Sequence, residues 1–218
     1  MRSIVIEAIF IGYEALTVLL PLIIVFAVLN RVNKKHGRQN SLRRFLMLCA
    51  FAVYIFATLH FTGAGTIFNI FRNITNPHYS GRFSLVPFVN GIDIAGCLLN
   101  ILLFVPLGFL VPLLWPQTDK FKYALLAGLS LLFFIEISQF FGYRLLDIDD
   151  LIANTAGALL GHLMYGLFAR ITKWKSKQLN HPKYEPFFYL AAMFLGHFLL
   201  YDSPALRALL FGSDRLPF

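Results

Sequence analysis

Charged residues are scarce in this chain of 218 residues. They make up 14% of the sequence, whereas an ordinary soluble domain has about 25%. Hydrophobic residues make up 58%, against roughly 45 to 50% in soluble proteins, which excludes a normal water-soluble fold. The two cysteines, Cys49 and Cys97, fall near opposite membrane faces of the spans predicted below, too far apart in depth for a disulfide.

The sequence also lacks the common motifs of soluble enzymes. It contains no glycine-rich nucleotide loop, no nucleophile elbow and no cluster of Cys and His with zinc-ligand spacing. We find no internal repeat, although opposed repeats are typical of many small transporters. Any chemistry must therefore come from carboxylates, amides and arginine.

Long apolar runs are what the chain does contain. A helix rises 1.5 Å per residue, so about 20 apolar residues cross a bilayer core about 30 Å thick. Five runs reach or nearly reach that length, and a shorter sixth would cross with help from its flanks. We expect spans at residues 6–29, 45–62, 94–115, 121–142, 149–169 and 187–201. The sequence predicts an all-α, polytopic membrane helix bundle of about six transmembrane helices, in one membrane domain comprising residues 1–218.

The basic residues divide unequally between the two sides of such a bundle. The connections after the first, third and fifth spans hold 13 of the 19 basic residues and two acids, whereas the other side holds six basic residues and nine acids. Loops rich in Lys and Arg stay in the cytoplasm, so both termini are expected to be extracytoplasmic. The formal net charge of +8 is explained by this topology, and we expect no nucleic-acid partner.

Amphipathic segments are expected at the outer face. Residues 67–74 place Ile and Phe on one helical face, with Asn69, Arg72 and Asn73 on the other. This pattern is typical of a helix lying on the membrane surface. A similar segment is expected at residues 204–211.

Polar residues inside the spans concentrate on the outer half of the membrane. Such side chains are costly in lipid and usually face the bundle interior or a watery cavity. They lie at spacings of three or four residues, which places each set on one helical stripe, provided that the fifth span begins a turn early. They are Asp93, Gly96 and Asn100 in the third span, Glu136, Gln139 and Tyr143 in the fourth, and Asp147, Asp150 and Asn154 in the fifth. Arg144 lies between the last two sets as the obvious counter-ion.

Several of these residues also have a purely structural interpretation. Asn100 and Asn154 are suited to hydrogen bonds that only hold helices together. Asp147, Asp149 and Asp150 form a run that would cap a helix N-terminus. In the same span, Gly157 and Gly161 indicate close helix packing.

Glu136 is harder to explain by structure alone, because it lies about six residues, roughly 9 Å, inside its span. We therefore predict an outer site with two groups of residues. The candidate catalytic residues are Glu136, Asp147 and Asp150, and the candidate ligand-binding residues are Asn100, Gln139, Arg144 and Asn154. No cofactor and no metal site is predicted, although oxygen ligands from the two aspartates leave a divalent cation open.

The histidines are not expected to form a site. His60, His162 and His197 lie in different spans and, as we interpret the sequence, at different depths, so each is expected to pack in the core or at the interface. Glu14, deep in the first span, is considered only as an indirect member of the outer site.

Five motifs follow one another between about residues 82 and 170. They are Ser84-Leu85-Val86-Pro87-Phe88, Asn100-Ile101-Leu102-Leu103-Phe104-Val105-Pro106-Leu107-Gly108, Glu136-x-x-Gln139, Arg144-x-x-Asp147-x-x-Asp150 and Asn154-x-x-Gly157-x-x-x-Gly161. Their order and spacing resemble the VanZ-like family of bacterial membrane proteins, which commonly has Asn in place of Ser84. The family-like core would thus be residues 82–170, with two spans before it and one after.

The resemblance implies a multipass protein of the bacterial plasma membrane. The family is named for a protein associated with resistance to the lipoglycopeptide teicoplanin, and the resemblance supplies no reaction. We expect an envelope factor whose outer polar cavity binds or modifies a lipid-linked or lipid-tailed molecule. The expected partners are membrane lipids and either a lipid-linked cell-wall precursor or a lipoglycopeptide; the oligomeric state stays open. Alternatives are an intramembrane hydrolase or transferase acting on a phospholipid or polyprenyl-linked substrate, and a structural scaffold.

Overall fold

The computed structural model describes residues 2–35, 42–74, 83–84, 87, 91, 93–140, 146–173, 182–205 and 208. Within these residues, nearly all regular structure is α-helical. The elements are α1 (Arg2–Lys35), α2 (Leu42–Thr62), α3 (Ile67–Ile74), β1 (Phe83–Ser84), α4 (Ile94–Leu114), η1 (Pro116–Thr118), α5 (Phe121–Phe140), β2 (Leu146–Asp147), α6 (Ile148–Ile171) and α7 (Glu185–Leu200). The prediction of an all-α membrane helix bundle is confirmed, and β1 and β2 add only a two-residue parallel pairing.

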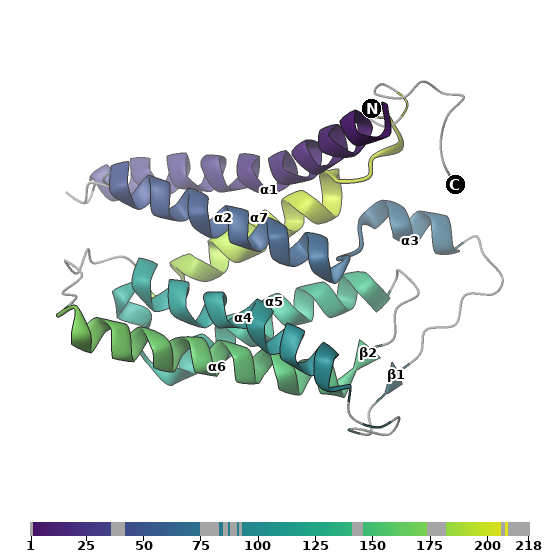
Figure 1. Ribbon diagram of the computed structural model, residues 1–218. Helices are drawn as coiled ribbons and strands as arrows, with labels where there is room; N and C mark the ends of the chain where they lie inside the picture. Colours follow the sequence, from purple (N-terminus) through teal and green to yellow (C-terminus); the bar gives the residue numbers. More distant parts are fainter. Residues whose placement is uncertain are drawn as a thin grey trace.

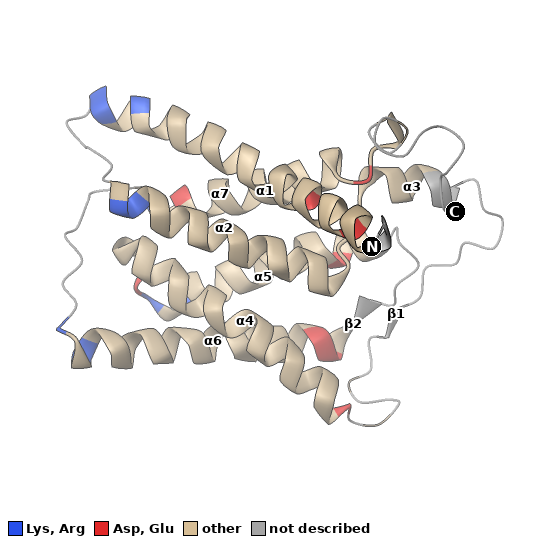
Figure 2. Ribbon diagram, turned by 45° about the horizontal axis from the view of Figure 1, so that its top comes forward, with Lys and Arg blue, Asp and Glu red and all other residues tan. Residues whose placement is uncertain are grey.

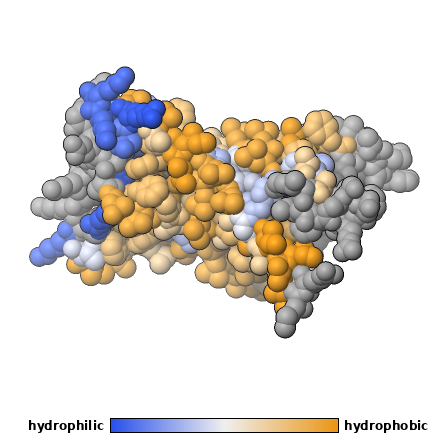
Figure 3. Space-filling view, turned by 90° about the horizontal axis from the view of Figure 1, so that it is seen from above, coloured by the Kyte–Doolittle hydropathy of each residue, from blue (hydrophilic) through white to orange (hydrophobic). Residues whose placement is uncertain are grey.

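Five helices, α1, α2, α4, α5 and α6, are long and apolar enough to cross a membrane. In Figure 1, α1 and α2 form one side of the bundle, α4, α5 and α6 form the other, and α7 crosses between them. The outward faces of the long helices carry large apolar side chains, and Figure 3 shows these covering the middle of the molecule. Such a surface is suited to lipid rather than to water.

The sixth predicted span is the short helix α7, whose 16 residues rise about 24 Å. Its first residue, Glu185, forms an ion pair with Arg44 at the start of α2, with 2.9 Å between Oε1 and Nη2. At its last residue, the carbonyl of Leu200 accepts a hydrogen bond from the Tyr13 hydroxyl of α1. Gly196 lies so close to α1 that a Cβ there would overlap that helix. Helix α7 is therefore an integral part of the bundle.

Charge separates along the bundle as the sequence predicts. The Lys and Arg residues whose side chains the structure describes gather at one end of the helices, and Asp and Glu, apart from Asp119 and Glu185, lie toward the other (Figure 2). We call these the basic end and the acidic end. Helix α1 begins at the acidic end and carries Lys34 and Lys35 in its last turn at the basic end.

Helices α4 and α6 pack through glycines. A Cβ at Gly108 of α4 would overlap the backbone of Ala158, and one at Gly157 or Gly161 of α6 would overlap the backbone of α4. The predicted packing role of Gly157 and Gly161 is thus confirmed. Because Gly157 lies against Ile101, this packing sets the register of the polar residues that precede them on both helices.

The amphipathic segment predicted at residues 67–74 forms helix α3. It begins after a turn in which Gly63 has φ of 62°. The Thr66 backbone N–H and hydroxyl both donate to Oδ1 of Asn69, at 2.8 and 2.6 Å, and this side-chain capping satisfies groups at the helix start. The segment predicted at residues 204–211 lies largely outside the described residues.

Candidate functional site

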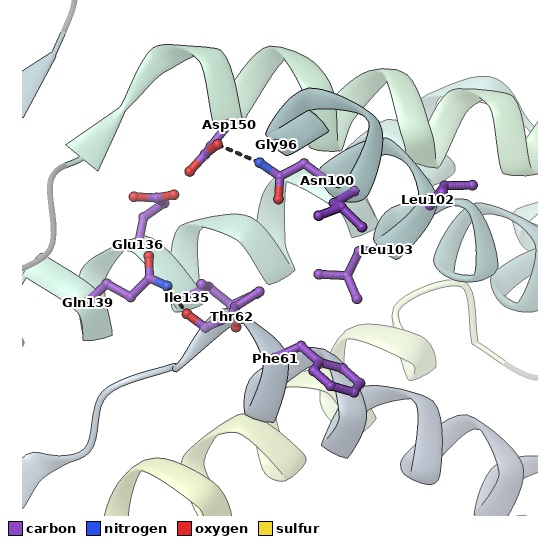
Figure 4. A pocket seen from close by; sticks show the side chains of 11 residues that line it. Phe61, Thr62, Gly96, Asn100, Leu102, Leu103, Ile135, Glu136, Gln139 and Asp150 are labelled. Atoms are coloured by element: carbon purple, nitrogen blue, oxygen red, sulfur yellow. Dashed lines mark hydrogen bonds between the residues drawn. The ribbon is translucent and has the colours of Figure 1, made fainter. Parts of the chain in front are cut away.

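A cavity of about 860 Å³ lies between α2, α4, α5 and α6 toward the acidic end. Its volume is in the range of pockets that hold small molecules, roughly 300 to 1,000 Å³. The lining residues are Phe61 and Thr62 from α2, Gly96, Leu99, Asn100, Leu102 and Leu103 from α4, Ile135, Glu136 and Gln139 from α5, and Asp150 from α6. Residues far apart in the sequence therefore share one site (Figure 4).

The polar part of the cavity is held by two hydrogen bonds between helices. Asn100 donates through Nδ2 to Oδ1 of Asp150 at 2.5 Å, which joins α4 to α6. Gln139 donates through Nε2 to the backbone carbonyl of Thr62 at 2.6 Å, which joins α5 to the end of α2. Figure 4 shows Glu136 between Asp150 and Gln139, with its carboxylate beside both. Two carboxylates and two amides thus converge within one cavity.

The rest of the cavity lining is apolar. Leu103 and Ile135 form part of this wall, while Phe61, Leu99 and Leu102 are also largely exposed on the outside of the bundle. Residues that line a cavity and are exposed at the same time mark its mouth. The mouth therefore opens on the apolar surface of the bundle, and the cavity joins this surface to a polar interior end.

The structure brings four of the seven predicted site residues together in this cavity. They are Asn100, Glu136, Gln139 and Asp150. Asn154 is buried in α6 but does not line the cavity, and its Oδ1 has no hydrogen-bond partner among the described residues. Arg144 lies outside the described residues, as does Tyr143.

Asp147 occupies a different place from the one the sequence indicated. Helix α6 begins at Ile148, close to the predicted start of the fifth span at residue 149. The condition under which Asp147 would share the stripe of this helix is therefore not met. Asp147 is the last residue of β2, where it stands in register with Ser84 of β1. Two of the motif segments, which are more than 60 residues apart, thus meet through backbone pairing at the acidic end.

Sequence reasoning missed a second cluster, formed by Glu14 of α1, His60 of α2 and His197 of α7. Oε2 of Glu14 lies 2.7 Å from Nδ1 of His60, and Oε1 lies 3.9 Å from Nδ1 of His197. The expectation that these two histidines lie at different depths is wrong. A signal was present: His60 is two residues before the end of α2, and His197 is three residues before the end of α7. His162 stands apart, stacked on Tyr165 in α6.

The part of the chain that the structure describes contains no group of three or more His, Cys, Asp or Glu residues placed to hold a metal ion. Because the side chain of Asp147 is not described, a cation held by Asp147 and Asp150 stays a prediction. The structure does place the carboxylates of Glu136 and Asp150 in the cavity, and these groups could accept a proton from a bound molecule.

Comparisons with known proteins place these residues in a family. Residues 15–169 match a model of the VanZ/LLP1 family. Protein VanZ from Enterococcus faecium is 32% identical over 108 residues, which cover 49% of this chain and 62% of that protein. The match thus spans less than two thirds of this relative's length. No solved structure matches significantly. All the residues that line the cavity fall within the family match, and the chain belongs to the VanZ/LLP1 family.

Proposed function

We propose that this protein binds or modifies a lipid-linked or lipid-tailed molecule in the cavity at its acidic end. The observation that carries this proposal is the combination of a polar interior end with a mouth on the lipid-facing surface. A molecule with an acyl or polyprenyl chain would keep that chain in the bilayer, while its headgroup reaches Asn100, Glu136, Gln139 and Asp150.

The hydrogen bonds within the cavity support a particular kind of headgroup. The amide nitrogens of Asn100 and Gln139 already donate to protein acceptors. Their amide oxygens and the carboxylates of Glu136 and Asp150 are acceptors. A headgroup rich in N–H and O–H donors, such as the sugar and peptide of a cell-wall precursor, complements such a lining. Arg144 is proposed as a ligand for an anionic group of the same molecule.

The proposed location is the bacterial plasma membrane, with the basic end in the cytoplasm. This orientation follows from the tendency of Lys-rich and Arg-rich loops to stay inside, and it makes both termini extracytoplasmic. It also places the cavity in the outer half of the membrane, where headgroups of outward-facing lipids lie.

We further propose a link to lipoglycopeptide resistance, because the chain belongs to the VanZ/LLP1 family and is similar to a Protein VanZ. Less teicoplanin would bind to a cell if the protein altered a surface ligand, or if it changed the membrane region that holds the antibiotic's acyl tail. Both routes act through a lipid-tailed molecule at the outer face.

The experiment compares cells that express the wild-type chain, Glu136→Gln or the matched control Glu7→Gln at equal abundance in the membrane. Glu7 is an exposed acid of α1 outside the cavity. Labelled teicoplanin bound per cell should fall with the wild type and the control, and should return to the level of non-expressing cells with Glu136→Gln. Equal binding with and without the wild-type protein would refute the proposal.

A second candidate function is an intramembrane hydrolase or transferase. It is favoured by the two carboxylates that reach one cavity from different helices, with Asp150 oriented by Asn100. In this case Glu136 would act as general acid or base, on a phospholipid or polyprenyl-linked substrate. Purified protein incubated with a lipid extract of the host, with and without Mg²⁺, should yield a new product by mass spectrometry. No product in either condition would count against catalysis.

A further inference from the structure

The cluster of Glu14, His60 and His197, which we call the Glu14 cluster, lies outside the cavity and is assigned no role by the proposed function. The side chains of Glu14 and His197 are almost completely buried, whereas that of His60 is 41% exposed. One carboxylate therefore faces an imidazole at the surface and another in the core. Glu14 and His197 also lie outside the residues that match the family.

The titratable groups that face this cluster come from three helices and the segment after α7. Besides the cluster itself, α1 contributes Tyr13, which donates to the Leu200 carbonyl. The ring of Tyr201 stacks on His197, with 5.0 Å between ring centroids, and the next residue, Asp202, is buried. A carboxylate and two imidazoles within this setting can share and exchange protons.

The geometry of His197 indicates how its ring is protonated. Nε2 lies 3.3 Å from the backbone carbonyl of Ala64, which can only accept, so Nε2 carries a hydrogen and donates to it. Nδ1 faces Glu14 at 3.9 Å, beyond hydrogen-bond distance, and has no hydrogen-bond partner among the described residues. In a neutral ring this nitrogen presents a lone pair to the carboxylate. One added proton, on either group, converts repulsion into an N–H or O–H hydrogen bond and draws the two together.

The turn held by His197 adjoins the cavity wall. Residues 63–66 connect α2 to α3, and the cavity residue Thr62 immediately precedes them. From α5, Gln139 donates to the carbonyl of Thr62, and the hydroxyl of Ser138 accepts a hydrogen bond from the N–H of Gly65 at 3.0 Å. Gly65 packs so tightly that a Cβ there would overlap the backbone of Ser138. A shift of the turn therefore displaces the adjoining wall of the cavity, because close-packed interiors transmit displacement.

We infer that the Glu14 cluster is a proton-binding site that controls the cavity through this turn. When the cluster takes up a proton, His197 moves toward Glu14, and its hydrogen bond to the carbonyl of Ala64 changes. The wall formed by Phe61 and Thr62 then shifts against α5. The surface position of His60 gives the proton its route from outside. The inference rests on the proposed function only for the biological meaning of the cavity, because the coupling itself is measurable without a ligand.

The test follows the cavity wall by cysteine labelling in the full chain, reconstituted in nanodiscs, with Cys49→Ser and Cys97→Ser as background. Thr62→Cys reports the wall next to the turn, and Leu99→Cys on α4 is the matched control in the same cavity. A small uncharged maleimide labels each variant between pH 5 and pH 8. The ratio of the two rates cancels the pH dependence common to both thiols.

We expect this ratio to change with pH in the parent chain and to stay constant in Glu14→Gln. Suppose that the turn has two positions and that the proton affinity of the cluster differs tenfold between them. The ratio of the populations of these two positions then changes by about tenfold across the titration. His60→Gln, which alters the exposed member, should flatten the profile as well, and it decides the matter if Glu14→Gln does not fold. A constant ratio in the parent chain, or an unchanged profile in the folded variants, would overturn the inference.

The outcomes separate this inference from the proposed function. If the labelling ratio depends on pH but teicoplanin binding is the same for Glu136→Gln and the wild type, the proton site is retained and the proposed function of the cavity is refuted. If the labelling ratio is constant but Glu136→Gln loses the effect on teicoplanin binding, the proton site is refuted and the proposed function of the cavity is retained.

Discussion

The buried ion pair between Arg44 and Glu185 offers a quantitative test of how the short helix α7 is held. The side chains are 8% and 2% exposed, and 2.9 Å separates their charged atoms. At an effective dielectric constant of about 20, two unit charges at this distance attract by about 6 kcal/mol. Desolvation offsets much of that attraction, yet removing one partner of a buried pair costs about 3 to 5 kcal/mol, because the other charge stays buried.

Arg44 has further contacts that keep its charge buried when Glu185 is removed. Its Nη1 donates to the carbonyl of Leu114 at 3.3 Å, and its guanidinium lies 6.0 Å from the ring centre of Trp115. We therefore expect Glu185→Met and Arg44→Met each to lower the free energy of unfolding by about 3 to 5 kcal/mol. The double variant should lose far less than the sum, because replacing both charges with apolar side chains of similar volume is often close to neutral.

The assay is unfolding by SDS in mixed micelles, followed by tryptophan fluorescence, for the wild type, both single variants and the double variant. Such a double-mutant cycle isolates the interaction between the two side chains. Lys183→Met, an exposed residue just before α7, is the control and should unfold like the wild type. If the two single losses add up in the double variant, the pair does not hold α7 and the reasoning is refuted.

Three other predictions concern the glycine contact, the cavity and the topology. Gly161→Ala should destabilise the protein by about 1 to 3 kcal/mol through overpacking between α4 and α6, whereas Gly166→Ala, which meets open space, should not; equal unfolding midpoints would contradict this. Asn100→Ala should lower the free energy of unfolding by about 1.5 to 3 kcal/mol, because it removes a hydrogen bond to the charged Asp150. The variant should also lose the effect on teicoplanin binding per cell. A variant with unchanged stability and unchanged binding would show that this bond is dispensable. In the background of Cys49→Ser and Cys97→Ser, Lys35→Cys should react with an impermeant maleimide only after cells are permeabilised. Labelling of intact cells would reverse the proposed orientation.

The helices and the separation of charge could be predicted because both depend on local properties. Whether a run of residues leaves water depends on its own length and hydropathy, and Figure 2 shows the basic residues at one end, as their loops indicated. Part of the cavity could also be predicted from the sequence. Glu136 and Gln139 are three residues apart, so helical periodicity alone places them on one stripe of α5.

Contacts between helices depend on tertiary packing and could be predicted only in part. Asn100 and Asp150 are 50 residues apart, and the sequence assigned them to the same half of the membrane without pairing them. They meet because glycines allow the backbones of α4 and α6 to approach closely. The place of Asp147 could not be predicted for a similar reason, since its backbone pairing with Ser84 involves a distant segment.

The sequence by itself determined that this protein is a membrane helix bundle with a basic end and an acidic end, because hydropathy and charge act residue by residue. Only the tertiary structure decided that Glu14 lies between His60 and His197. The depth of each residue can be counted along its own helix, but its neighbours depend on which helices lie side by side. That choice is made by shape, as where Gly196 lets α7 lie directly against α1, and no local pattern in the chain records it.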